Sequence, residues 1–560
     1  MSTYSIGLDF GTESVRALLV DVASGEAVAT AVEPYADGVI DERLPGTGEQ
    51  LPPDWALQNP ADWLTGMERT IVSVLSQSRI DPTAVVGIGI DFTSCTVLPT
   101  TADATPLCDI ESFRAEPHAW PKLWKHHGAQ SQAERITSVA AAREEPWLPR
   151  YGGRISSEWL LPKALEIAEG APRVYDAAVR FIEAADWVVW RLTGVLARNA
   201  CAAGYKGTWH KQEGPPGRDY LAAVKAGFED FYDTRAGAPV VSPGTNVGSL
   251  TEEWSARLGL PRGVAVAAPI IDAHAAVLGG GVAGPGTFVM MMGTSTCHLL
   301  MADAERPVEG MAGVVEDGIV PGYVAYESGQ AAVGDLFAWF ANHAVPPSYH
   351  AAAAEQGVSI QALLTSKAEW FGPGSSGLLI LDWWQGNRST LGRSDLSGLI
   401  VGATLSTRAE EIFHALVEAT AFGTRAIVES FTDQRLPVTS IVAGGGLTRN
   451  AMLMQIYADV TGRPIAVAGA PQASALGAAM LGAVAAGGAS GGYDSLGAAV
   501  ARMAPPPVHV YQPNDVNRRQ YDVLYAEYKR LYDHFGRGGN DVMKVLRGMR
   551  RRGPSLPASS

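Results

Sequence analysis

A hairpin motif occurs twice in this chain, and the two copies constrain the fold more than any other feature. In IGLDFGTESVRALLVD, from residue 6, the turn GTES lies between two apolar runs that alternate as strands do. In GTFVMMMGTSTCHLLMA, from residue 286, the turn GTST occupies the matching place between two further strand-like runs. An internal repeat on this scale predicts two related domains that face each other.

Strand-like and helix-like segments alternate along most of the remaining sequence. The run VVGIGIDFTSCTVLP predicts a buried strand that ends at Asp91, and GVAVAAPIIDAHAAVLGGG places Asp272 between a buried strand and a helix of small residues. Residues 59–78, with Pro60 directly after the cap Asn59, predict an amphipathic helix. Such alternation is typical of an α/β fold, which is the predicted fold class.

Length and glycine content suggest the domain boundaries. A chain of 560 residues exceeds the usual size of one domain. The segment GGGVAGPG predicts a hinge at Gly279–Gly281, which gives an N-terminal domain of residues 1–280 and a C-terminal domain of residues 281–535. Residues 536–560 are basic and rich in glycine and serine, and predict a flexible tail.

Composition excludes several classes of function. The formal net charge of −15 argues against nucleic acid or an anionic membrane as the main partner, because both would be repelled. The four cysteines are scattered, form no C-x-x-C pair and are expected to be reduced thiols. The chain starts with no signal-like segment and contains no apolar run of membrane-spanning length, so a cytoplasmic location is expected.

The two turns have the chemistry of a phosphate site. Backbone amides in a glycine-bearing turn can point together at an anion, and the hydroxyls of Thr12 and Ser14 add donors. The Walker pattern is absent, and each turn runs into a strand. One copy alone could be an ordinary β-turn, but two copies favour a phosphate chain held from both domains. Asp9 flanks the first turn and could face phosphates only with a cation between them, which predicts Mg²⁺.

A third glycine-rich turn follows a buried strand in VTSIVAGGGLTRNAMLMQIYADVTG. Gly444, Gly445 and Gly446 would let the backbone approach a flat ligand closely. The alternative is a tight strand-to-helix turn that binds nothing.

Together these motifs resemble those of the superfamily of actin, sugar kinases and heat-shock ATPases. Within it, the chain resembles the FGGY carbohydrate kinases over nearly its whole length. The resemblance implies two ribonuclease-H-like (actin-like ATPase) domains around a deep cleft. More narrowly, several segments look like those of the family members that phosphorylate L-ribulose in bacterial arabinose breakdown: GIGIDFTSCTVLP, LWKHH, YGGRISSEW, EAADWVVWRLTG, AGYKGTWH, MGTSTCHLL, YESGQAAVGDLFAWF and LDWWQGNRST.

The resemblance implies ATP as phosphoryl donor with Mg²⁺, and it assigns roles to particular residues. Asp272 matches the family's general base, although it could also be a helix cap. Asp9 matches the carboxylate that supports the metal. The expected sugar-binding residues are Ser94, Trp124, Lys206, Asp272 and Glu327. The expected ATP- and phosphate-binding residues are Gly11, Thr12, Ser14, Gly293, Thr294, Ser295, Gly444, Gly445, Gly446 and Asn450.

Several alternatives stay open at this stage. Lys206 and Glu327 could be an exposed surface pair, and Asp91 is left out of the catalytic set because it could be structural. The substrate could be another pentulose such as xylulose, or a polyol. A nucleotide-switched binding protein of the actin or chaperone type would use the same ATP cleft without a sugar. The expected partners are a ketopentose and ATP, and a homodimer is an open alternative.

Overall fold

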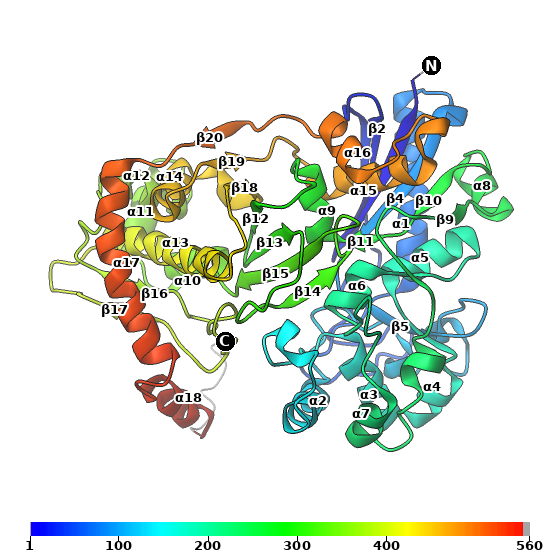
Figure 1. Ribbon diagram of the computed structural model, residues 1–560, viewed down its shortest axis with the longest axis horizontal. Coiled ribbons are helices and arrows are strands. Elements are labelled where there is room, and N and C mark those ends of the chain that lie inside the picture. Colours follow the sequence, from blue (N-terminus) through cyan, green and yellow to red (C-terminus); the bar gives the residue numbers. More distant parts are fainter. Residues whose placement is uncertain (1, 553–560) are drawn as a thin grey trace.

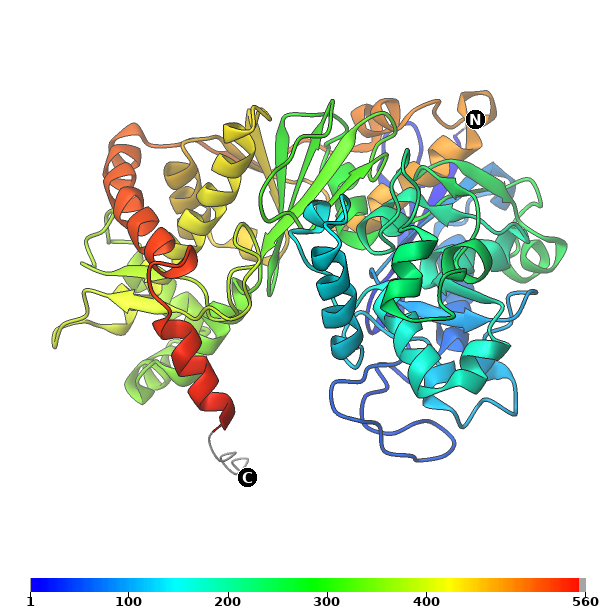
Figure 2. The same cartoon turned by 60° about the horizontal axis from the view of Figure 1, so that its bottom comes forward.

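The computed structural model describes residues 2–552 and arranges them as two α/β halves that lie side by side (Figures 1 and 2). Each half is built on a seven-stranded sheet. The strand order is β3-β2-β1-β4-β10-β9 in the first sheet, where β11 also pairs with β4. The order is β14-β15-β13-β12-β18-β19-β20 in the second. The predicted α/β fold class is therefore confirmed.

The strands of the first sheet are β1 (Tyr4–Phe10), β2 (Ser14–Asp21), β3 (Ala27–Pro34), β4 (Val85–Phe92), β9 (Asn246–Ser249), β10 (Ala265–Ala267) and β11 (Ile270–Ile271). Those of the second are β12 (Thr287–Met292), β13 (Thr296–Ala302), β14 (Gly313–Glu316), β15 (Val324–Gln330), β18 (Ser440–Gly444), β19 (Ile465–Val467) and β20 (His509–Tyr511). Three small two-stranded sheets pair β5 (Val97–Thr100) with β6 (Arg180–Glu183), β7 (Arg198–Asn199) with β8 (Val240–Val241), and β16 (Leu379–Leu381) with β17 (Leu399–Val401).

The helices of the first half are α1 (Pro60–Ser78), α2 (Gln130–Ala142), α3 (Leu160–Gly170), α4 (Pro172–Ala177), α5 (Ala184–Thr193), α6 (Ala200–Tyr205), α7 (Arg218–Val224), α8 (Glu252–Leu258) and α9 (Asp272–Gly279). Those that follow in the chain are α10 (Gly334–His343), α11 (Pro347–Glu355), α12 (Ile360–Ala368), α13 (Ala409–Asp433), α14 (Ala451–Thr461), α15 (Ala473–Ala486), α16 (Leu496–Met503), α17 (Asp515–Gly536) and α18 (Val542–Arg552).

The repeat in the sequence is also a repeat of topology. Strand β2 is antiparallel to β1, and β4 lies parallel to β1 on its other side. Strands β13 and β18 stand in the same relation to β12. Residues 11–13 and residues 293–295 form the two hairpin turns at the ends of β1 and β12. The two turns therefore occupy equivalent places in two related sheets.

Helix α15 packs on the first sheet although it follows the second sheet in the chain (Figure 1). Glycines make this contact close. A Cβ atom on Gly89 would lie 1.8 Å from the carbonyl oxygen of Ala478, and one on Gly477 would lie 2.0 Å from that of Ala275 in α9. Real Cβ atoms do not approach other atoms so closely, so the backbones of α15, β4 and α9 touch only because side chains are absent there.

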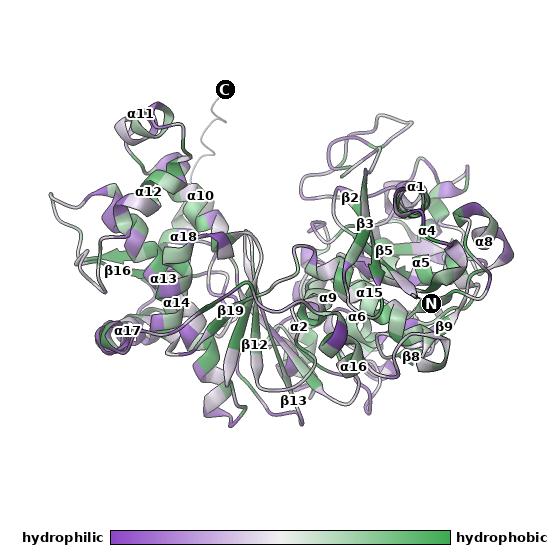
Figure 3. Cartoon of the chain, turned by 90° about the horizontal axis from the view of Figure 1, so that it is seen from above, coloured by the Kyte–Doolittle hydropathy of each residue, from purple (hydrophilic) through white to green (hydrophobic). Residues whose placement is uncertain are grey.

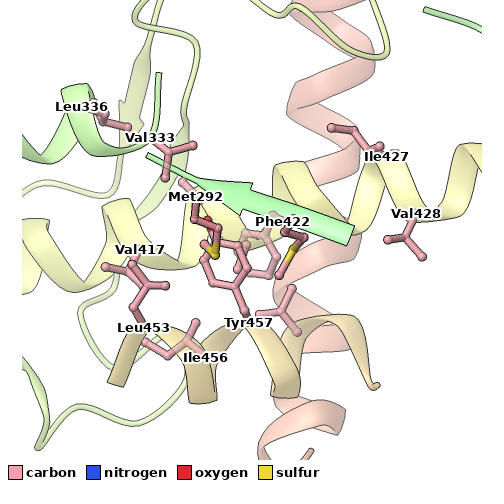
Figure 4. Close-up of a cluster of buried hydrophobic side chains, with 14 of the residues drawn as sticks. Met292, Val333, Leu336, Val417, Phe422, Ile427, Val428, Leu453, Ile456 and Tyr457 are labelled. Atoms are coloured by element: carbon pink, nitrogen blue, oxygen red, sulfur yellow. The ribbon is translucent and has the colours of Figure 1, made fainter. Parts of the chain in front are cut away.

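Two of the hydrophobic cores support the joint between the halves and the second hairpin turn. The core around α9 and α15 takes residues from both sheets, among them Val20 of β2 and Leu299 of β13, and so joins the two halves. The core of the second half packs Met292, at the end of β12, with Phe422 of α13 and Tyr457 of α14 (Figure 4). This second core supports the strand end from which the second hairpin turn projects.

Hydropathy follows the layers of the fold. Strands of both sheets are largely hydrophobic, whereas α8 and α17 are mainly hydrophilic (Figure 3). Within residues 2–552, none of the helices is long and apolar enough to cross a membrane. All four cysteines are free.

The expectation of a flexible tail from residue 536 is wrong for much of that segment. Residues 542–552 form helix α18, Met543 is buried in the core of the second half, and Arg547 donates to the carbonyl of Leu396 at 3.0 Å. A tertiary contact thus orders a segment whose composition suggested disorder. Residues 553–560 lie outside the described residues.

The contact of α15 gives a first prediction. We expect Gly477→Ala to reduce the free energy of unfolding by about 3 kcal/mol or more, because the added methyl group meets backbone that cannot move aside. Gly497→Ala in α16 is the matched control, since its added methyl group would meet no atom within 4 Å. That control should leave stability unchanged or raise it by up to about 1 kcal/mol. Urea denaturation followed by circular dichroism measures both, and equal stabilities of the two variants would contradict the packing described.

Candidate active site

Three aspartates gather at the carboxyl ends of neighbouring parallel strands. Asp9 of β1 lies beside Asp91 of β4 in the register of the sheet, and Ile270 of β11 lies on the other side of Asp91. Asp272 follows β11 directly, as the first residue of α9. Ligands of α/β folds bind at this edge of a sheet. Asp272, which the sequence singled out, is therefore near Asp9, and Asp91 lies between their strands.

Burial and neighbouring carboxylates raise the pKa of Asp272 and of Asp91. Asp272 is partly open to solvent but surrounded by protein, and its pKa rises to about 7. Loss of solvation is the main cause, and the charges of Asp9 and Glu327 add to it, whereas the Ala273 N–H at 2.6 Å opposes it. That hydrogen bond shows that Asp272 also bonds the first turn of its own helix. Such a pKa suits a group that gains and loses a proton near neutrality.

Asp91 is the most deeply buried of the three aspartates. Its side chain is fully buried, and neither carboxylate oxygen has a hydrogen-bond partner. Burial and the charges of Asp9 and Asp272 raise its pKa well above the ordinary value. The negative charge of Asp9 is paired with the positive charge of Arg16, whose Nη1 lies 3.0 Å from Asp9 Oδ2. Among residues 2–552, no cluster of three or more His, Cys, Asp or Glu side chains is arranged to hold a metal ion by itself.

The first hairpin turn is tied to two other segments of its own half. The Gly11 N–H donates to the carbonyl of Ser14 at 2.9 Å and closes the turn. Gln58 Nε2 donates to the Thr12 carbonyl at 2.7 Å, and Trp124 Nε1 donates to Thr12 Oγ1 at 3.0 Å. Because its oxygen already accepts this bond, the Thr12 hydroxyl keeps its own proton free to donate to a ligand.

The second hairpin turn is supported from behind by the start of α10. The Gly293 N–H donates to the carbonyl of Ser295 at 2.9 Å. The N–H groups of Val333 and Asp335 both donate to the Thr294 carbonyl, at 2.9 and 3.1 Å. Gly293 and Thr294 are exposed. No hydrogen bond joins the two hairpin turns within the part of the chain that the structure describes.

The triple-glycine turn adjoins the second hairpin. Gly445 has a φ angle of +97°, and a Cβ atom there would lie 2.4 Å from the Met292 carbonyl oxygen, so the turn itself requires glycine at this position. Gly446 is exposed, and a Cβ atom there would meet nothing within 4 Å. Asn450 caps α14, since its Oδ1 accepts from the Leu453 N–H at 3.0 Å. The geometry of the turn thus accounts for the glycine at position 445, whereas a side chain at position 446 would meet only open space.

Lys206 and Glu327 form a buried ion pair between the two halves. Lys206 Nζ lies 3.0 Å from Glu327 Oε1 and 2.9 Å from Oε2, and both side chains are less than a tenth exposed. The alternative of an exposed surface pair is therefore wrong. Burial alone would raise the pKa of Glu327, but Lys206 and Arg388 outweigh it and lower that pKa to about 2. Glu327 is consequently ionised at neutral pH.

Two close contacts bring this pair together. Lys206 directly follows α6, and α6 packs against the edge strand β14. A Cβ atom on Gly204 would lie 2.4 Å from a methyl carbon of Val315, and one on Gly313 would lie 2.3 Å from the Tyr205 ring. The missing side chains let α6 approach the second sheet, where β15 carries Glu327 beside β14.

The loops that carry Ser94 and Trp124 share a buried support. Lys163 of α3 is fully buried, and its ammonium group donates to the carbonyls of Cys95, Leu123 and Lys122 at 2.5, 2.8 and 3.2 Å. Burial lowers the pKa of Lys163. These three bonds fix both loops relative to each other at residues next to Ser94 and Trp124.

Sequence reasoning missed two residues of this region. Asp91 stays outside the predicted catalytic set, although aspartates recur at the strand ends of this edge. Arg388 is not among the predicted site residues, and its Nη2 lies 2.8 Å from Glu327 Oε1. Arg388 stands in a loop outside any phosphate or strand-end motif, so the sequence offered no signal beyond its place in LDWWQGNRST.

Comparison with known proteins gives a consistent result. The model of the N-terminal domain of the FGGY family of carbohydrate kinases matches residues 4–279, and that of the C-terminal domain matches residues 288–486. A protein named ribulokinase from Geobacillus thermodenitrificans is 50% identical over 545 residues, which cover 97% of this chain and 96% of that protein. A ribulokinase from Mycolicibacterium smegmatis is 46% identical over 549 residues, covering 98% and 96%.

Solved structures agree in fold. A xylulose kinase from Rhodospirillum rubrum superposes with a TM-score of 0.78 at 22% sequence identity, covering 98% of this chain and 100% of that one. A glycerol kinase from Plasmodium falciparum, solved with ADP, superposes with a TM-score of 0.73 at 17% identity, covering 94% and 98%. At such low identity these likenesses show the architecture and not the substrate.

The buried ion pair gives a prediction about stability. We expect Lys206→Met to reduce the free energy of unfolding at pH 7 by about 3 kcal/mol, because Glu327 would stay charged and buried with only Arg388 as partner. The double variant Lys206→Met with Glu327→Leu should recover most of this loss, since no uncompensated charge remains.

Lys211→Met is the matched control for this measurement. Lys211 pairs with Glu316 in a partly exposed position and should contribute less than about 1 kcal/mol. Denaturant titration at pH 7 compares all three variants. Equal losses for Lys206→Met and Lys211→Met would show that the Lys206 pair does not carry the buried charge described.

Proposed function

Because the chain belongs to the FGGY family of carbohydrate kinases, we propose that it transfers the terminal phosphoryl group of ATP to L-ribulose and forms L-ribulose 5-phosphate. The observation that carries this proposal is the near-complete alignment with proteins named ribulokinase at 46–50% identity. In arabinose breakdown this reaction would prepare the ketopentose for further conversion as a phosphate ester.

Asp272 is the proposed general base. Its pKa of about 7 leaves a substantial fraction of carboxylate at neutral pH, and that carboxylate can accept the proton of the attacking sugar hydroxyl. The Ala273 N–H bonded to Oδ1 holds the side chain in one orientation. The N-cap position of α9 is Ile271, so Asp272 does not cap the helix, and its bond to the first turn is compatible with a role as base.

Lys206 and Glu327 are the proposed binding groups for the sugar. Both lie near enough to Asp272 to change its pKa, so a hydroxyl held by them would be close to the base. Ammonium and carboxylate groups together can donate to and accept from the hydroxyls of a polyol chain. Ser94 and Trp124 complete the proposed sugar site on the loops that Lys163 supports.

The two hairpin turns are the proposed phosphate site. Thr12 and Thr294, with Gly11, Ser14, Gly293 and Ser295, would hold the phosphate chain from opposite halves, which requires the halves to close over ATP. The hinge predicted at Gly279–Gly281 would permit this motion. The adenosine end of ATP would lie along Gly444–Gly446, where Gly446 faces open space, and near Asn450.

Mg²⁺ fits the carboxylates beside the first turn. The unbonded carboxylate oxygens of Asp91 and the nearby Asp9 are hard oxygen donors of the kind that Mg²⁺ prefers, and Mg²⁺ commonly needs only one or two such groups in addition to phosphates and water. We propose that these two residues hold it. When bound with ATP, the ion would neutralise charge on the phosphate chain.

A different pentulose is the alternative substrate. The solved structures named as xylulose kinases share only the fold with this chain, whereas the relatives of high identity are named ribulokinase. A nucleotide-switched binding protein would have no need of a buried Lys206–Glu327 pair beside Asp272.

A substrate panel with one variant tests the proposal. We expect the purified protein with ATP and Mg²⁺ to use L-ribulose with a higher kcat/KM than D-xylulose or glycerol. We expect kcat/KM for L-ribulose to rise about tenfold per pH unit below pH 7 and to level off above it, because the active base is the deprotonated form of a group whose pKa is about 7.

Asp272→Asn keeps the shape of the side chain and the hydrogen bond from Ala273 but cannot accept the proton. It should lower kcat by roughly 10² to 10⁴ while the Kd for L-ribulose changes little. A preference for glycerol over every pentulose would refute the substrate assignment. Near-normal turnover by the variant would show that Asp272 is not the base.

The bond between Trp124 and Thr12 predicts coupling between the sugar loop and the phosphate turn. We expect Trp124→Phe and Thr12→Val each to lower kcat/KM for ATP, because each removes one partner of the bond that orients the Thr12 hydroxyl. The double variant should lose less than the sum, with a coupling energy of about 1 kcal/mol.

Trp120→Phe is the matched control, because Trp120 lies in the same segment and its Nε1 donates to the Arg114 carbonyl instead. Its kcat/KM for ATP should stay unchanged. Strictly additive losses for Trp124→Phe and Thr12→Val would mean that the two side chains act independently.

A further inference from the structure

Arg388 reaches the ion pair of the proposed sugar site from the loop after β16. Its Nη2 lies 2.8 Å from Glu327 Oε1, the oxygen that also accepts from Lys206. Burial acts to lower the pKa of Arg388, but the negative charge of Glu327 outweighs it and holds that pKa above its usual value. Lys206 belongs to the first half and shares this oxygen, so the guanidinium group lies where the two halves meet.

The Arg388 guanidinium keeps unbonded N–H groups after this contact. Its side chain remains 38% exposed, whereas that of Glu327 is only 4% exposed. Arginine carries five N–H donors and no acceptor, and the contact with Glu327 is the only side-chain hydrogen bond of Arg388 in the described chain. Several charged donors are therefore free to meet a ligand beside Glu327.

Both acceptor oxygens of Glu327 already have partners. Glu327 Oε1 accepts from both Lys206 and Arg388, and Oε2 accepts from Lys206 and lies 3.7 Å from His274 Nε2. A ligand atom that lies between Arg388 and Glu327 thus finds free donors on Arg388, while the Glu327 oxygens are already bonded. A hydroxyl group needs both kinds of partner to be fully bonded, whereas a carbonyl oxygen only accepts.

The chemistry of the proposed reaction supplies such an oxygen. When a 2-ketopentose closes into a furanose ring, its 5-hydroxyl oxygen becomes the ring oxygen and cannot be phosphorylated. A protein that phosphorylates O5 must therefore bind the open-chain form, in which the C2 carbonyl is free. That carbonyl is separated from O5 by three carbon–carbon bonds, so it lies away from the base.

We propose that Arg388 donates a hydrogen bond to the C2 carbonyl oxygen of the open-chain ketopentose and thereby selects ketoses over polyols. This inference rests on the proposed function, because it takes L-ribulose as the substrate. Glu327 orients the guanidinium through the bond at 2.8 Å, and the exposed N–H groups face the sugar. Arg388 is then a specificity-determining residue that recognises the end of the substrate remote from the transferred phosphoryl group.

The test compares L-ribulose with ribitol, which has a hydroxyl group in place of the C2 carbonyl. Calorimetric titration of the full chain gives Kd for each compound, for the unmodified protein and for Arg388→Met. We expect the variant to weaken L-ribulose binding by about tenfold to a hundredfold and ribitol binding by less than about threefold. The preference for the ketose should fall accordingly.

Arg393→Met is the matched control. Arg393 lies in the same loop and pairs with Asp395 at 2.6 Å, so its loss should change neither Kd. Equal weakening of both compounds by Arg388→Met would show that Arg388 only holds Glu327 in place, and would overturn the proposal, as would no weakening at all. Failure of the unmodified protein to phosphorylate L-ribulose would instead overturn the proposed function, and this inference with it.

Discussion

The backbone contact of α15 with β1, β4 and α9 determines how the rest of the molecule is arranged. Gly7 and Gly89 in the sheet, and Gly477 in the helix, remove the side chains that would otherwise keep these backbones apart. The contact fixes the distance of α9 from the sheet and hence the place of Asp272, its first residue, relative to Asp9. Because α15 and α9 also share a core with strands of the second sheet, the same contact joins the two halves. Close packing of this kind tolerates little change.

Charge is distributed unevenly across the proposed active site. On the side of the hairpin turn, Asp9, Asp91 and Asp272 repel one another, and Arg16 is the one cation paired with any of them in the described residues. On the side of the proposed sugar site, Glu327 is paired with two cations and stays ionised. The first group needs a further positive charge when phosphates arrive, whereas the second already has more positive than negative charge. Nucleotide and sugar thus meet two different electrostatic environments within one site.

Local features were predictable from the sequence, and contacts distant along the chain were not. Asn59 caps α1 as its position before Pro60 indicated, and the apolar alternation around Gly11 and Gly293 specified both hairpins. Lys206 and Glu327 are 121 residues apart, and no periodicity relates them. They meet because small residues allow α6 to approach β14, which only the folded structure reveals. Without the resemblance to a known family, this pair could not have been assigned to one site.

The path of the chain between the halves has a consequence for synthesis. After β19 the chain returns to the first half as α15 and α16, and then crosses again to add β20 at the edge of the second sheet and α17 on its far side (Figure 1). Neither half is therefore one continuous piece of sequence. Multidomain proteins commonly fold from the N-terminus as each domain leaves the ribosome. Here the first half cannot complete its core until residue 486 has left the ribosome, and until then the apolar surface that α15 covers stays exposed. The second half is completed later still.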